Sequence, residues 1–118
     1  MGIAKNLDQE RAAFAWKAIG AKPDETYVKL AKGMPALVMG NGLMQTLAFL
    51  NSKDKGKGHG DLLRHVIEWL GKRFDNFGPD FDGAIQWLYG SPPSEYLRAT
   101  DEALEILRWI RQLADARK

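Results

Sequence analysis

The segment from Gly33 to Ser52, GMPALVMGNGLMQTLAFLNS, contains no charged residue. It is long enough to cross a membrane as a helix, which takes about 20 apolar residues. However, Pro35, the Gly40-Asn41-Gly42 turn and several polar side chains interrupt it, and a turn inside a bilayer would leave backbone polar groups without hydrogen-bond partners. The segment therefore predicts a buried helix–turn–helix corner in a globular protein, and no membrane partner is expected.

Helical periodicity dominates the sequence before this corner. Asn6 and Gln9 have the spacing of a capping box, which predicts a first helix that ends near Gly20. A second helix is expected from Asp24, and its apolar face stays in phase through Pro35. Because proline removes a backbone hydrogen bond and disfavours helical geometry in the residue before it, one kinked helix or two short helices are both compatible with this stretch. The Gly40-Asn41-Gly42 turn should then start a helix from about Leu43 to Asn51.

The second half of the chain gives a similar pattern. Residues 51–60 contain no apolar side chain and predict a flexible basic loop. Asp61 is expected to cap a helix that Gly78-Pro79 stops, and a short helix should end at Gly90. The last and longest helix follows Ser91-Pro92-Pro93; its apolar stripe is Tyr96, Ala99, Ala103, Ile106, Ile110 and Leu113. No stretch alternates with a period of two, so the sequence predicts an all-α fold of about six helices in a single domain spanning residues 1–118.

Few residues suggest catalysis. There is no cysteine, and the two histidines, His59 and His65, do not have the spacing of a zinc site. Asp80 and Asp82 are better explained by a turn and a helix cap than by acid–base chemistry. We therefore expect no catalytic site, metal, cofactor or small-molecule substrate. The first residues lack a secretory signal, which favours a cytoplasmic location.

The helix predicted from Leu43 is apolar around most of its circumference, and only Gln45 and Thr46 form a polar part. Such a helix is either central to its own core or shared with a partner, and a domain of this size has difficulty surrounding a helix completely. Both interpretations remain open at this stage. The residues proposed for a protein interface on this helix are Leu43, Met44, Gln45 and Phe49.

Positive charge is placed unevenly. Residues 1–59 carry nine lysines and arginines against five acidic residues, whereas residues 60–118 carry eight against ten. The loop lysines either belong to a solvated linker or form a clamp on nucleic-acid phosphates, and lysines on the polar face of the second helix could extend the same surface. The residues proposed for RNA contact are Lys22, Lys29, Lys32, Lys53, Lys55 and Lys57.

The arginines are interpreted differently. On the last helix, arginines alternate with acidic residues, and Glu105 and Arg108 have the spacing of a helix-surface ion pair. This pattern is typical of a solvated or protein-binding face, so Arg98, Arg108 and Arg111 are added to the candidate protein interface. Arg11 falls within the apolar arc of the first helix, where its aliphatic stem is expected to pack while its guanidinium reaches solvent.

Several blocks of the chain resemble one protein family. These are LDQERAAFA (7–15), LAKGMPALV (30–38), NGLMQTLAFL (41–50), YLRATDEAL (96–104) and WIR (109–111). Together they resemble the small all-helical subunit of the type III-B CRISPR effector, the Cmr complex, with the central block the most specific. The likeness covers residues from about 7 to 117.

The resemblance implies a non-catalytic subunit of an RNA-guided antiviral defence complex. Its partners would be other Cmr subunits and copies of itself, stacked so that they help line the channel in which guide and target RNA pair. The family supplies no catalytic or base-reading motif to transfer, so the proposed RNA contacts rest on charge. Two other interpretations remain: a helical protein–protein adaptor that does not contact RNA, and a small hydrolase with a scattered active site.

Overall fold

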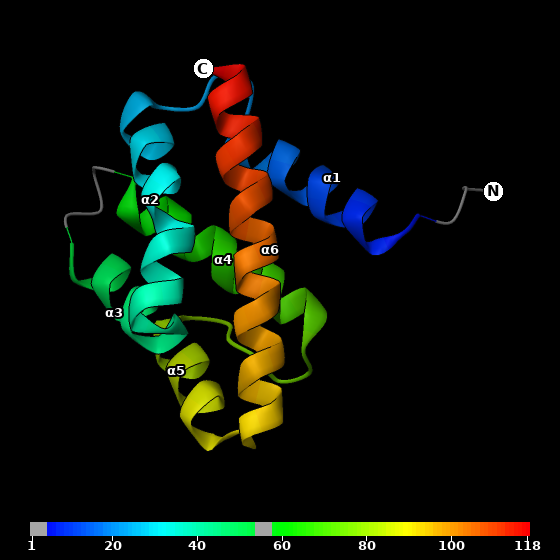
Figure 1. Cartoon of the computed structure of the whole chain (residues 1–118), viewed down its shortest axis with the longest axis vertical. Coiled ribbons are helices and arrows are strands. Elements are labelled where there is room, and N and C mark those ends of the chain that lie inside the picture. Colours follow the sequence, from blue (N-terminus) through cyan, green and yellow to red (C-terminus); the bar gives the residue numbers. More distant parts are fainter. Residues whose placement is uncertain (1–4, 54–57) are drawn as a thin grey trace.

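A long C-terminal helix forms the axis on which the other helices pack. The computed structural model describes residues 5–53 and 58–118, and these contain six helices and no strand. The last helix, α6, runs along the molecule and packs against α1, α2 and α4, as Figure 1 shows. The helices are α1 (Leu7–Ile19), α2 (Glu25–Asn41), α3 (Leu43–Ser52), α4 (His59–Arg73), α5 (Phe81–Gly90) and α6 (Pro93–Arg117). The predicted all-α fold is confirmed.

The apolar stripe of α6 forms the centre of the core. Ala99, Ala103, Ile106 and Ile110 are fully buried, as the sequence predicted, whereas Tyr96 is only partly buried. Small alanine side chains at two of these positions let neighbouring helices approach α6 closely. Burial of this stripe against three other helices fixes α6 in place because apolar area removed from water stabilises the fold.

The uncharged segment forms the predicted corner. α2 is one continuous helix with Pro35 inside it, so of the two alternatives only a single helix is found. Gly42 follows with φ of +87°, a conformation that glycine adopts without strain, and α3 starts at the next residue. Thr46 is buried rather than exposed, because its hydroxyl donates a hydrogen bond of 2.8 Å to the Gly42 carbonyl and is thereby satisfied inside the core.

The helix ends confirm some predictions and correct others. The side chains and backbone amides of Asn6 and Gln9 bond reciprocally at 2.8 and 3.0 Å, so α1 begins with the predicted capping box. Asp80 accepts a hydrogen bond from the Gly83 amide and caps α5. Asp61, however, is not a cap: α4 begins earlier, at His59, and Asp61 lies in its first turn.

The basic loop is shorter than predicted. α3 extends through Ser52, and α4 takes up His59 and Gly60, so only residues 53–58 lie between the helices. Residues 54–57 lie outside the described residues, and the predicted flexibility of the loop falls on them. None of the described helices is both long and apolar enough to cross a membrane.

Candidate nucleic-acid interface

Three of the lysines proposed for RNA contact lie around one hollow of about 380 Å³. Lys22 precedes α2, and Lys29 and Lys32 project from its first turns, three residues apart on its exposed side. The packing of α2 against α6 adds Lys118, from the end of the chain, to the same hollow. A smaller hollow of about 300 Å³ beside it is lined by Lys32 and Arg111. We call Lys22, Lys29, Lys32, Arg111 and Lys118 the basic surface.

Two carboxylates partly neutralise the basic surface. Asp115 lies between two ammonium groups, 3.0 Å from Nζ of Lys118 and 3.2 Å from Nζ of Lys32. These ammonium groups, Lys118 first, lower the pKa of Asp115, which therefore stays ionised. Glu25 lies 3.4 Å from Nζ of Lys29, and both of these side chains are largely exposed.

The remaining charge of the basic surface is positive. Five cations face the two carboxylates Glu25 and Asp115, an excess of three positive charges. Within the described part of the chain, neither Lys22 nor Arg111 takes part in an ion pair. Phosphate groups are suitable ligands for such a surface, because lysine contacts to a polyanion are favoured by counterion release and need no fixed geometry.

Lys53, the described lysine of the loop, does not line this hollow. Lys53 directly follows α3, and its ammonium group lies 5.2 Å from the centroid of the Phe49 ring. Lys55 and Lys57 lie outside the described residues. After the loop, the chain meets the start of α2: a Cβ added to Gly58 would lie 3.1 Å from Cα of Tyr27. Gly58, the residue before α4, therefore lies against the first turn of the helix that carries Lys29.

The candidate protein-interface residues of α3 differ in exposure. Leu43 is fully buried in the core and offers no surface to a partner. Gln45 is exposed, whereas Met44 and Phe49 are partly buried against the core. The Phe49 ring meets His59 edge-on, with the ring centroids 5.7 Å apart. The accessible part of α3 is thus Gln45 together with the outer edges of Met44 and Phe49.

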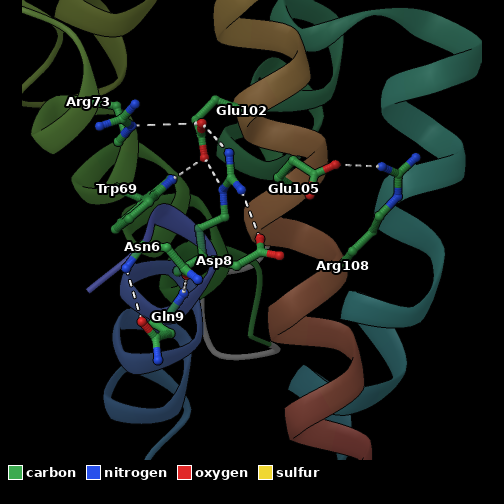
Figure 2. A network of polar contacts seen from close by, with 9 residues as sticks. Asn6, Asp8, Gln9, Trp69, Arg73, Glu102, Glu105 and Arg108 are labelled. Carbon is green, nitrogen blue, oxygen red and sulfur yellow. Dashed lines mark hydrogen bonds and ion pairs between the residues drawn. The ribbon is translucent and has the colours of Figure 1, made fainter. Parts of the chain in front are cut away.

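The three arginines on α6 do not act together. Arg98 pairs with Glu95 at 2.6 Å and lies over the Phe74 ring. Arg108 forms the predicted pair with Glu105 at 3.1 Å, as Figure 2 shows. Arg111 lies on the basic surface instead.

A buried polar cluster was missed by the sequence analysis. Arg11 does not extend to solvent as expected: its Nε and one terminal nitrogen donate hydrogen bonds of 2.7 and 2.8 Å to the two carboxylate oxygens of Glu102. Trp69 donates to the same carboxylate at 2.9 Å, and Arg73 approaches it at 3.8 Å (Figure 2). Glu102 is buried, and the position of Arg11 within the apolar arc of the first helix was the available signal of a buried partner.

The environment of Glu102 keeps it charged. Burial alone would raise the pKa of its carboxyl, but the hydrogen bonds from Arg11 and Trp69 outweigh burial and lower the pKa below its ordinary value. A bidentate arginine–carboxylate pair has a fixed geometry. Because the three groups come from α1, α4 and α6, the cluster sets how these helices meet.

His65 is also buried, and its Nδ1 lies 2.8 Å from the hydroxyl oxygen of Tyr27. Burial lowers the pKa of His65 and raises that of Tyr27, so both groups are neutral at pH 7. Within residues 5–53 and 58–118, no group of three or more histidine, aspartate or glutamate side chains is arranged to hold a metal ion.

Comparison with known proteins gives consistent matches. The sequence profile described as CRISPR-associated protein (Cas_Cmr5) matches residues 7–117. A curated protein from Thermotoga maritima, "CRISPR system Cmr subunit Cmr5", is 29% identical over 94 residues, which are 77% of this chain and 66% of that protein, just under two thirds of its length. The crystal structure of a CRISPR-associated Cmr5 family protein from Thermus thermophilus superimposes with a TM-score of 0.80 at 27% identity, covering 96% of this chain and 97% of the other.

Proposed function

This chain belongs to the Cmr5 family of CRISPR-associated proteins, and on that basis we propose that it is a non-catalytic, architectural subunit of a type III-B CRISPR (Cmr) effector in antiviral defence. In this proposal several copies stack beside the other Cmr subunits, and their basic surfaces lie along the channel that holds the guide–target RNA duplex. Lys53, Lys55 and Lys57 would extend the contact with RNA. The proposed location is the cytoplasm.

The observation that carries this proposal is the basic surface. Its excess of three positive charges lies on α2 and α6 and at their ends, and these two helices pack against each other, so the cations are presented together to a phosphate backbone. Contacts of this kind bind nucleic acid without reading its sequence. That property suits a subunit that must accept any guide and target.

The test removes positive charge from the basic surface of this chain within the reconstituted Cmr complex. Lys22, Lys29 and Lys32 are changed together to glutamine, and target-RNA capture is measured over a series of salt concentrations. Losing three phosphate contacts should weaken capture and make the slope of log K against log salt shallower by about 2. The matched control changes Lys5, Lys17 and Lys72 to glutamine; these exposed lysines lie outside the basic surface.

The outcomes separate the candidate functions. If both triple variants alter capture equally, net charge alone is responsible and the assigned surface is wrong. If neither variant alters capture while both enter the complex, the chain acts as a protein–protein adaptor without RNA contact. If the wild-type chain does not co-assemble with Cmr subunits at all, the architectural role is wrong.

A further inference from the structure

A second, larger hollow lies away from the basic surface, between the first half of α4 and the segment that leads into α5. Its volume is about 580 Å³, within the range of sites that hold side chains or small ligands. Its charged lining residues are Asp61, Arg64, Asp80 and Asp82. We call it the acidic hollow.

The wall of the acidic hollow is apolar. Leu63 and Ile67, on successive turns of α4, belong to the core and present their outer atoms to the hollow. Phe81, at the start of α5, is partly exposed, and Pro79 completes this wall. An apolar side chain that entered the hollow would therefore be removed from water on several sides.

The rim of the hollow is negative. Asp80 uses one oxygen to cap α5, and its other oxygen accepts no hydrogen bond from a described residue. Asp82 forms no ion pair with any described residue. The one cation of the lining, Arg64, is already committed to Asp61 at 3.2 Å and to Glu68 at 3.4 Å. The four charged lining residues thus sum to a net charge of −2, opposite in sign to the basic surface. A phosphate backbone would be repelled here.

From this combination we propose that the acidic hollow docks an aromatic or leucine side chain that is flanked by lysine or arginine, in a peptide segment of a different protein chain. The apolar side chain fills the hollow, and its basic neighbours pair with Asp80 and Asp82. Charge complementarity of this kind selects the partner and fixes its orientation. The inference goes beyond the proposed RNA contact and concerns a different surface.

The surface of this chain argues against a second copy as the occupant. Four large apolar side chains are exposed among the described residues: Trp16, Met39, Tyr89 and Leu97. One face of the Trp16 ring is already covered by the Arg117 guanidinium, 3.6 Å from the ring centroid. Arg98, next to Leu97, is paired with Glu95, and neither Met39 nor Tyr89 has a basic neighbour in sequence. Trp16 is followed by the exposed Lys17, but it could fill the hollow only if Arg117 left its ring, and the other three have no unpaired basic neighbour in the sequence.

The test uses the isolated full chain and short capped peptides, with binding followed by backbone amide chemical shifts. The probes are Gly-Lys-Trp-Lys-Gly, Gly-Glu-Trp-Glu-Gly and Gly-Lys-Ala-Lys-Gly. The first should bind with Kd on the order of 1 mM and shift the amides of Gly60 and Phe81. The second should bind about tenfold more weakly, because two attractions become repulsions, and the third about tenfold more weakly, because the apolar contact is lost.

Variants assign the binding to the acidic hollow. Asp82→Lys should weaken binding of the first peptide several-fold, and Asp82→Asn, which perturbs the first turn of α5 less, should weaken it by a smaller factor. The control is Asp101→Lys, an exposed acid on α6 outside the hollow, which should leave binding unchanged.

Equal binding of all three peptides, or no binding of the first, overturns the proposal. Self-association of the chain in sedimentation that Asp82→Lys abolishes would place a second copy in the hollow and overturn the assignment to a different chain. No RNA is present, so these results are independent of the proposed RNA contact.

Discussion

Arg11 and Glu102, 91 residues apart in the sequence, form a bidentate pair in which both carboxylate oxygens accept hydrogen bonds from one guanidinium. The pair joins α1 to the buried face of α6, whose other buried residues are all apolar. Trp69 adds a third hydrogen bond from α4. The free energy of unfolding should therefore depend on this cluster more than on any surface ion pair.

Glu102→Gln tests this dependence. The amide keeps the size of the side chain but loses the charge and one acceptor, so Arg11 loses its buried counter-charge and keeps only the exposed carboxylate of Asp8, 2.9 Å away. We expect the free energy of unfolding to fall by about 2 kcal/mol in urea titrations. The control is Glu105→Gln, which removes the exposed pair with Arg108 and should cost less than about 0.5 kcal/mol. Equal losses for the two variants would contradict a special role of the buried pair.

His65 predicts a loss of stability on mild acidification. Burial holds its pKa in the folded protein below the ordinary value of 6.5, so the unfolded chain binds a proton more readily than the folded one. The contribution of neutral His65 to stability is complete above pH 6.5 and decreases as the pH falls towards the folded pKa, by at most about 1.4 kcal/mol per pH unit.

The measurement compares urea unfolding at pH 7.5 and pH 5.5 for the wild-type chain and for His65→Gln. The wild type should lose more stability over this interval than the variant. Glu102 does not interfere, because its pKa in the folded protein lies below the ordinary value of 4.5. The stability that its ionised form contributes is therefore lost only in more acidic solutions. An identical pH dependence of the two proteins would show that His65 is not the titrating group.

Local sequence signals predicted most of the backbone. The Asn6–Gln9 capping box and the Gly42 corner depend on residues within a few positions of one another, and both are found. The start of α4 was misjudged because a distant contact decides it. Gly58 has φ of +88° and lies against the backbone of Tyr27, and the helix begins at the next residue rather than after Asp61.

The candidate nucleic-acid interface was likewise predicted only where it depends on residues close together in the sequence. Helical spacing placed Lys29 and Lys32 on one exposed side of α2. Their neighbours Asp115 and Lys118 come from the other end of the chain, and only the packing of α2 on α6 brings them there. The Arg11–Glu102 pair was invisible for the same reason, since periodicity within one helix contains no information about its partner.

Two glycines with opposite surroundings test the packing at the start of α5. A Cβ at Gly83 would overlap the carbonyl oxygen of Gly78, so Gly83→Ala must displace backbone and should lower the free energy of unfolding by about 1–3 kcal/mol. At Gly33, inside α2, a Cβ would meet nothing within 4 Å. Gly33→Ala should therefore raise stability by up to about 1 kcal/mol through helix propensity. Thermal unfolding of both variants checks this contrast, and a stabilised Gly83→Ala would refute the close approach.

Gln45 tests whether the outer side of α3 contacts another subunit. The side chain is exposed, so Gln45→Arg should leave the free energy of unfolding within about 0.5 kcal/mol of the wild type. In a packed interface, however, the longer charged side chain should reduce incorporation into the reconstituted complex. Gln86→Arg, at an exposed position of α5, is the matched control. Normal incorporation of the Gln45 variant would remove α3 from the proposed interface.

Asp115 offers a change that should strengthen rather than weaken the proposed RNA contact. Its carboxylate neutralises part of the basic surface by pairing with Lys32 and Lys118. Asp115→Asn removes that negative charge and releases both ammonium groups, so target-RNA capture by the reconstituted complex should tighten by about two- to threefold, with a steeper dependence on salt. Asp101→Asn on the same helix removes an equal charge outside the basic surface and should have no such effect. Since net charge rises equally in both variants, tighter capture in Asp115→Asn alone would assign the effect to the basic surface, whereas equal capture in the two would argue that RNA does not bind there.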